Sequence, residues 1–445
     1  MGFHLVWRRA GASLLLALVA GLPAGVGRAE SADLQIASGR IHVARLCTSV
    51  PIGVPSLRPI SAGIDSAVVL ATENWRTRFQ THGVDLLPPL QFDDALPSGA
   101  TYDPGREARN ARTCVHRHDT FGYVGPLNSG EAGISEPILN RAGMVQISPS
   151  NTLPVLTSPA GTIRSELEPA TEHRDLAYVT YYRTIGTDAL QGPSGLAYLR
   201  RVLRVRNFVL IAETDQYSGG IAGAVQSYAL RIGFRASGIV HVPATRSASA
   251  TRREFRAVAD AIVAADPGGV YLAGEEAHNV QPNLILKDIR DRGYEGPIMM
   301  PDADVVSGFV DGIRTPGPLY GTIPGIDPSA VALPFRRAFQ RHFHRPLQEY
   351  DAEAYDAEAY DAANIELHAL YQALLAGKAY GPVRSIRRAL LPYIAHTHWR
   401  GATGVTTFDR NGDTTNRLVS VYGIRGNQWA YSGLAPRVTG VPSAG

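Results

Sequence analysis

The sequence lacks a strong charge of either sign and, after its first thirty residues, any long hydrophobic run. Its formal net charge is +3 over 445 residues, and no basic run carries interleaved aromatic residues. Nucleic acid is therefore not indicated as a partner. No later stretch is apolar enough to span a bilayer, so we expect no stable membrane insertion of the mature protein. A chain of this length can bury a large core and favours two domains.

Motifs of covalent chemistry are also missing. We find no Gly-x-Ser-x-Gly elbow, no glycine loop ending in Lys-Ser or Lys-Thr, and no Cys-His nucleophile pair. The histidines show no metal-ligand spacing, and residues 409–413, which resemble the start of a calcium loop, have Ser420 where that loop ends in Glu. We expect no enzyme activity, cofactor or metal, and interpret 409–413 as a turn between paired strands at 403–408 and 418–424.

The first 29 residues have the pattern of a secretory signal peptide. Arg8 and Arg9 form a positive region, residues 10–22 are apolar, and Gly27 and Ala29 are the small residues before a cleavage site. A membrane anchor is the alternative, but the apolar run is short for a bilayer span. No cysteine lies near the cleavage site, so we expect no lipid anchor. The mature protein is predicted to be periplasmic or secreted.

The two cysteines, Cys47 and Cys114, are free to pair in an exported protein. Cys47 is predicted to end the first strand, on the ligand side of the sheet, and Cys114 to lie late in a helix, at the opposite edge. A strand of six residues spans roughly 20 Å, whereas a disulfide needs its Cα atoms within about 7 Å. We therefore predict two buried free thiols.

Residues 122–157 alternate between apolar strands and small polar loops. Strands are expected to end at Val124 and Ser148, and polar loops follow at 125–130 and 150–152. In a parallel sheet both loops lie at the carboxyl ends of the strands, where open α/β sheets bind ligands. Their hydroxyls and free backbone N–H groups suit a small anion such as a carboxylate.

Three segments carry a family resemblance: GYVGPLNSG at 122–130, VQISPSNTLPVLT at 145–157 and YYRTIGTDALQGP at 181–193. They resemble the substrate-binding proteins of branched-chain amino-acid ABC transporters, and the resemblance extends loosely over residues 40–430. It implies the type I periplasmic binding protein fold. That fold has two doubly wound, Rossmann-like α/β lobes, joined by a three-segment hinge, that close on an amino acid.

The alternation of predicted strands and helices agrees with two α/β lobes. We predict an N-terminal lobe from 36–185 plus 325–405, and a C-terminal lobe from 186–324 plus 406–435. The predicted crossings between the lobes lie near 184–187, 323–327 and 404–407. Three connecting segments suit hinge closure.

The resemblance implies a carboxylate site in the first lobe. Ser129 and the loop of Ser150, Asn151 and Thr152 match the positions that supply hydroxyls and backbone groups to the ligand carboxylate. The alternative is that these residues only satisfy the backbone of strand-end loops.

Acidic residues at matching positions would receive the ligand's ammonium, which is costly to bury unpaired. Asp302 follows a predicted strand at 298–300 and resembles the family's acidic ligand residue, with Asp304 as a rival and helix capping as the alternative role. Asp188 resembles a further site residue near the hinge, or else caps the helix from Leu190.

Tyr217 matches an aromatic residue that covers the ligand, with helix-face packing as its alternative role. Glu275 and Glu276 stand where the family often has an aromatic residue, and Leu57 and Arg58 replace a usual tyrosine. A pocket with extra acid and fewer aromatic residues would favour a cationic or polar ligand. The alternative is that both glutamates face solvent.

The unit Tyr-Asp-Ala-Glu-Ala occurs twice from Tyr350 and begins again at Tyr360. Five residues rotate a helix by about 140°, so at least one of Tyr350, Tyr355 and Tyr360 is expected to be exposed. We interpret the repeat as a local duplication without function.

Together these features predict an exported, monomeric solute-binding protein. It would capture an amino acid or related small polar molecule between two lobes and deliver it to an ABC transporter permease. The alternatives are a ligand-sensing module for a receptor or regulator, and an exported hydrolase.

Overall fold

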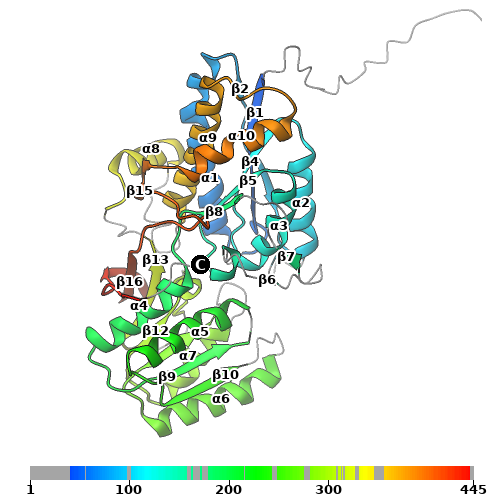
Figure 1. Cartoon of the computed structure of the whole chain (residues 1–445). Helices are drawn as coiled ribbons and strands as arrows, with labels where there is room; N and C mark the ends of the chain where they lie inside the picture. Colours follow the sequence, from blue (N-terminus) through cyan, green and yellow to red (C-terminus); the bar gives the residue numbers. More distant parts are fainter. Residues whose placement is uncertain are drawn as a thin grey trace, which may run out of the picture. The chain divides into compact units, whose positions relative to one another are not determined.

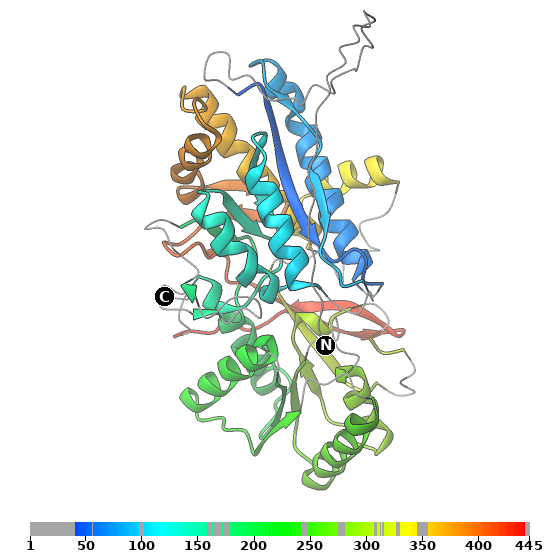
Figure 2. The same cartoon turned by 90° about the vertical axis from the view of Figure 1, so that its right-hand side faces the viewer.

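The computed structural model describes residues 41–55, 57–97, 102–157, 162–163, 171–172, 179–214, 216–242, 248–274, 281–306, 309–311, 313, 316–325, 330–344 and 355–440. These residues form two large sheets with helices on both faces (Figures 1 and 2). A two-stranded sheet of β6 (Thr162–Ile163) and β7 (Thr171–Glu172) stands apart from them. The predicted signal peptide lies outside the described residues.

The first sheet is parallel throughout and has the order β2-β1-β4-β5-β8, with β3 also paired to β1. Its strands are β1 (Val43–Val50), β2 (Asp85–Leu86), β3 (Leu90–Asp93), β4 (Thr120–Val124), β5 (Val145–Ser148) and β8 (Tyr181–Arg183). The strand order reverses beside β1, and open sheets of this kind bind ligands at the carboxyl ends of the strands around that point.

Helices cover both faces of the first sheet (Figure 1). One face carries α1 (Arg58–Gln80) and α9 (Asp356–Leu375). Two further helices pack on these, α8 (Leu333–Phe343) on α1 and α10 (Val383–Ala395) on α9. The other face carries α2 (Pro104–His116) and α3 (Ser129–Arg141). Side chains alternate along β1, so Leu46 joins the core under α1 and α9, whereas Cys47 joins the smaller cluster under α2 and α3.

Cys47 and Cys114 are joined by a disulfide with their Cα atoms 6.4 Å apart, so the prediction of two free thiols is wrong. The predicted strand ended too early. Because β1 continues to Val50, Cys47 lies inside the strand, opposite Tyr123 of β4, and not at the ligand edge. The helix α2 covers this face of the sheet and brings Cys114 to the same level.

The second sheet has the order β10-β9-β11-β12-β13-β16-β17, parallel up to β13 and antiparallel beyond it. Its strands are β9 (Val209–Glu213), β10 (Gly238–Val242), β11 (Val270–Ala273), β12 (Ile298–Met300), β13 (Leu319–Pro324), β16 (Val419–Arg425) and β17 (Gln428–Leu434). One face carries α4 (Asp188–Arg201) and α5 (Gln216–Arg231), and the other α6 (Ala248–Ala265) and α7 (Gln281–Asp291) (Figure 2). This arrangement confirms the predicted doubly wound α/β architecture, while the predicted lobe limits stay predictions.

The chain passes between the two sheets after β8, after β13 and before β16. The predicted strand pairing across residues 409–413 is wrong, apart from one bridge between Phe408 and Thr414. Instead β15 (Gly404–Thr406) pairs with β14 (Trp399–Gly401), and β16 pairs with β13 and β17. The physical reason is that β16 satisfies the main chain of β13, whose other edge already pairs with β12. The turn itself is present, because Asp409 accepts hydrogen bonds from the N–H groups of Asn411 and Asp413.

Candidate functional site

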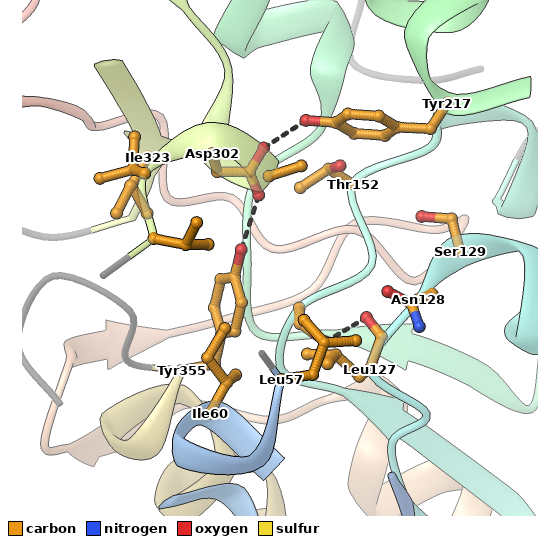
Figure 3. A pocket seen from close by; sticks show the side chains of 14 residues that line it. Leu57, Ile60, Leu127, Asn128, Ser129, Thr152, Tyr217, Asp302, Ile323 and Tyr355 are labelled. Atoms are coloured by element: carbon orange, nitrogen blue, oxygen red, sulfur yellow. Dashed lines mark hydrogen bonds between the residues drawn. The ribbon is translucent and has the colours of Figure 1, made fainter. Parts of the chain in front are cut away.

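A pocket lies between segments that belong to the two sheets, and five of the eight predicted ligand residues line it. These five are Ser129, Ser150, Thr152, Tyr217 and Asp302. Figure 3 shows the pocket with the side chains around it. Its remaining lining residues are Leu57, Ile60, Leu127, Asn128, Ala303, Val305, Val306, Ile323 and Tyr355.

Ser129 reaches the pocket as the first residue of α3. The small and polar residues at 125–130 predicted a loop here, but Glu131 accepts a hydrogen bond from the N–H of Asn128 at 2.8 Å and stabilises a helix start at Ser129. The amino terminus of a helix carries free N–H groups and a partial positive charge. It therefore suits an anionic group of a ligand.

The loop after β5 brings Ser150 and Thr152 to the same pocket. Ser150 donates its hydroxyl to the carbonyl of Leu127 at 2.7 Å. The N–H of Leu153 donates to the Ser129 hydroxyl at 3.3 Å, which ties this loop to the start of α3. Two loops with hydroxyls are thus held side by side, as the sequence predicted for a carboxylate site.

Asn151, also predicted to bind the ligand, points into the protein instead of lining the pocket. Its amide donates to the carbonyls of Pro126 and Leu127, at 3.1 and 2.8 Å, and accepts from the Tyr181 hydroxyl at 3.0 Å. The side chain therefore holds the two loops together. Sequence alone cannot show which way the side chain of a loop residue points.

Asp302 is the acidic group of the pocket and lies just after β12, in a short 3-10 helix (Asp302–Asp304). One carboxylate oxygen accepts from the Tyr217 hydroxyl at 2.6 Å, and the other from the Tyr355 hydroxyl at 2.8 Å (Figure 3). The oxygen that Tyr217 contacts also accepts from the Gln191 amide at 2.9 Å. Burial raises the pKa of Asp302, and these three donors oppose the rise by stabilising the carboxylate. Burial, followed by the nearby charge of Asp302, holds the pKa of both tyrosines well above the usual range, so they act as neutral donors.

Tyr355 is the site residue that sequence reasoning missed. It directly precedes α9 and lines the pocket, whereas the sequence interpretation gave no copy of the repeat a function. Tyr360, one unit later, faces elsewhere: its ring packs on Phe335 at 4.6 Å between centroids, and its hydroxyl accepts from Asn74 at 2.9 Å. Tyr350 lies outside the described residues. The sequence feature that could have identified Tyr355 is the Tyr-Asp-Ala unit at the start of a helix.

Three other predicted residues lie away from the pocket or outside the described part of the chain. Asp188 is buried and is the first residue of α4, with Thr187 as its cap, so it does not cap a helix from Leu190. Asp304 is buried and does not line the pocket. Glu275, like its neighbour Glu276, lies outside the described residues. Among the described residues, no group of His, Cys, Asp and Glu is arranged to hold a metal ion.

The rest of the pocket wall is apolar. Leu57 and Ile60, at the start of α1, face the pocket together with Leu127. Val305, Val306 and Ile323 add aliphatic surface from the second sheet. The pocket thus joins hydroxyls and a helix terminus, one carboxylate with two tyrosines, and an aliphatic wall. Small-molecule sites are commonly built in this way, from apolar surface with a few placed polar groups.

Residues from both helix-covered sheets and their loops thus line the same pocket. Residues 100–428 match the family described as periplasmic binding proteins, and the chain belongs to this family. Members of this family are exported solute-binding proteins. The predicted resemblance to the substrate-binding proteins of branched-chain amino-acid transporters is confirmed by relatives and by solved structures.

A Leu/Ile/Val/Thr-binding protein of Salmonella typhimurium is 24% identical over 258 residues, which are 56% of this chain and 61% of the relative. A leucine-, isoleucine-, valine-, threonine- and alanine-binding protein of Pseudomonas aeruginosa is 24% identical over 207 residues, 46% of this chain and 48% of the relative. The chain thus spans less than two thirds of the length of these relatives.

Solved structures show the same fold. An ABC transporter substrate-binding protein from Desulfitobacterium hafniense, in complex with Leu, has a TM-score of 0.65 at 18% identity, over 88% of this chain and 100% of that one. The predicted type I periplasmic binding protein fold is therefore confirmed. Within the described residues, no helix is both long and apolar enough to cross a membrane.

Proposed function

We propose that this protein captures an aliphatic amino acid in the pocket and delivers it to an ABC transporter. One observation carries the proposal: the same pocket holds hydroxyls beside a helix terminus and, from the other sheet, the buried carboxylate of Asp302. The first group suits a ligand carboxylate and the second an ammonium, so the pair fits the zwitterionic head of an amino acid.

The apolar wall supports an aliphatic side chain. The methyl groups of such a ligand would pack against Leu57, Ile60 and Val306. Burial of each methylene group contributes about 0.8 kcal/mol to binding. The names of the two relatives agree, since both bind leucine, isoleucine and valine. A cationic ligand stays a prediction that depends on Glu275 and Glu276. Among the described residues that line the pocket, Asp302 is the one with a carboxylate.

Export by a cleaved signal peptide, and a monomeric state, are part of the proposal. The Cys47–Cys114 disulfide supports export, because such bonds persist in oxidising compartments. We propose that the mature chain begins after Ala29.

The test is a thermal melt of the mature protein with a matched ligand series. L-Leucine has both head groups, 4-methylpentanoate lacks the ammonium, and 3-methylbutylamine lacks the carboxylate. We expect L-leucine at a hundred times its dissociation constant to add about 2.7 kcal/mol to the free energy of unfolding, and the other two to have little effect. A shift with the amine alone would replace the proposed ligand class with cations, and no shift with any amino acid would overturn the proposal.

Delivery to a transporter needs a separate experiment. Cells that lack the protein should lose high-affinity uptake of the ligand that the purified protein binds. Unchanged uptake, with binding intact, would favour the sensing alternative over transport.

A further inference from the structure

Arg183, the last residue of β8, has the largest of the described fully buried side chains, and its exposed fraction is 0%. It does not line the pocket. A buried guanidinium is costly unless its donors are paired. The hydrogen bonds of Arg183 therefore fix the segments that it contacts.

The guanidinium binds the loop that carries Thr152. One nitrogen, Nη1, donates to the carbonyls of Asn151 and Leu153 at 2.9 and 3.0 Å. The other, Nη2, donates to the Thr157 hydroxyl at 2.6 Å. The carbonyl of Thr152 itself accepts from the N–H of Asp188 at 2.8 Å. All three successive carbonyls of the loop are thus fixed.

These bonds set the direction of the Thr152 N–H. In a planar trans peptide the C=O and N–H groups point in opposite directions. Because the Asn151 carbonyl is drawn to Arg183, the N–H of the same peptide unit, which belongs to Thr152, points away from the guanidinium. Turned away in this manner, the N–H is a donor for a ligand at the pocket that Thr152 lines.

Arg183 also reaches the third segment that connects the sheets. Its Nε donates to Asp413 at 2.7 Å, and its backbone N–H donates to the carbonyl of Gly412 at 3.0 Å. Gly412 has a φ of 101°, and a Cβ there would come within 2.2 Å of the Tyr181 carbonyl, so glycine permits this close approach. Burial lowers the pKa of Arg183, but the charge and hydrogen bond of Asp413, together with Tyr181 and Asp188, offset this effect and the net shift is upward.

We propose that Arg183 is a positioning residue for ligand binding: it orients the Thr152 peptide toward the ligand carboxylate and couples that loop to the connecting segment at Asp413. The inference rests on the proposed function, since it assigns the carboxylate of an amino acid to this loop.

A second buried arginine provides a matched control. Arg387 of α10 has an exposed fraction of 2% and donates to the carbonyls of Val115, Arg117 and Thr120, none of which lines the pocket. Lysine keeps the charge in both positions but has one ammonium in place of a planar fork. R183K and R387K should therefore both lower the melting temperature, whereas only R183K should disturb the pocket loop.

The experiment compares the mature wild type with R183K and R387K by amide hydrogen exchange without ligand, and by titration with L-leucine. We expect R183K to speed exchange in peptides that cover 150–157, and to raise the dissociation constant for L-leucine about tenfold, the loss of one charge-assisted hydrogen bond. In R387K the exchange of 150–157 and the affinity should match the wild type. If R183K does not fold, T157V, which removes one acceptor of Arg183, should give a smaller effect in the same direction.

Two results would overturn the inference while leaving the proposed function intact. One is unchanged exchange of the loop in R183K. The other is faster exchange with an affinity for L-leucine equal to that of R387K. A wild-type protein that binds no amino acid would instead overturn the proposed function, and the carboxylate role of the loop with it.

Discussion

At the residue scale, the candidate site depends on one buried carboxylate. Asp302 accepts hydrogen bonds from Gln191 and Tyr217, which lie on helices packed against the second sheet. It also accepts one from Tyr355, which precedes a helix packed against the first sheet. The Tyr355 bond thus links the two sheets directly at the pocket. Hydrogen bonds to charged groups contribute about 1.5–3 kcal/mol each.

We expect Y355F to weaken binding of L-leucine about tenfold, because Asp302 loses the donor that joins the two sheets and tenfold corresponds to 1.4 kcal/mol. The measurement is isothermal titration of the mature protein. Y360F is the matched control from the next repeat unit, since the Tyr360 hydroxyl bonds Asn74 away from the pocket. Equal affinities of Y355F and wild type would show that the bond between the sheets does not support binding.

At the scale of single elements, several carboxyl groups are buried where helices meet strands. Asp65 of α1 accepts a hydrogen bond from Thr48 of β1 at 2.6 Å. Burial raises the pKa of Asp65 to about 7, with Thr48 opposing the rise. In the unfolded chain the group has the ordinary value near 3.9. The folded state therefore binds the Asp65 proton more tightly than the unfolded chain does. The resulting stabilisation of the fold is complete below about pH 4 and is lost as the pH rises through 7.

The melting temperature should accordingly fall between pH 5 and pH 8. Burial also raises the pKa of Glu358, to about 8, so this group contributes in the same direction. We expect D65N to flatten the pH dependence, because asparagine stays neutral and can still accept from Thr48. D85N, at an exposed position, should keep the wild-type slope. A slope that D65N leaves unchanged would mean that Asp65 does not titrate with folding.

The disulfide between β1 and α2 closes a loop with a sequence separation of 67 residues. Replacing Cys47 and Cys114 together by alanine should lower the free energy of unfolding by about 4 kcal/mol, mainly through the unfolded chain. Urea denaturation with and without reductant measures this cost. Reductant should destabilise the wild type and leave the double variant unaffected. A wild type that is insensitive to reductant at its unfolding midpoint would contradict the pairing.

Most elements were predictable because apolar periodicity and caps are local signals. The Asp103–Pro104 pair is such a local signal: α2 starts there, and the Asp103 side chain accepts from the N–H groups of Gly105 and Arg106. The errors arose where tertiary contacts decide. β1 extends through Cys47 because β3 and β4 flank it, and β16 joins β13 although a turn signal favoured a local hairpin.

The site was predictable to the extent that strand ends were. Ser129, Ser150, Thr152 and Asp302 all follow strands of the two sheets, and the structure brings them to one pocket. Tyr355 was missed because it lies at a helix start within a repeat, with no strand before it to mark the edge of a sheet. Whether a side chain in these loops faces the pocket is set by bonds between distant segments, which the sequence does not display.

At the scale of the whole molecule, the account requires one ligand to touch both sheets. The proposed carboxylate donors lie after β4 and β5, and the proposed ammonium acceptor, Asp302, lies after β12. A ligand held at both ends stabilises the closed arrangement by its differential affinity for closed and open forms. We expect the three connecting segments to permit such closure by hinge bending.

The most direct test is isothermal titration of the mature protein with L-leucine, repeated with D302N. Asparagine keeps the shape of Asp302 but cannot offer a negative charge to an ammonium. We predict one site per chain in the wild type, and an affinity at least a hundredfold weaker in D302N, about 2.7 kcal/mol. Undiminished binding in D302N, or no binding of L-leucine by the folded wild type, would contradict the claim that this pocket holds an amino acid through Asp302.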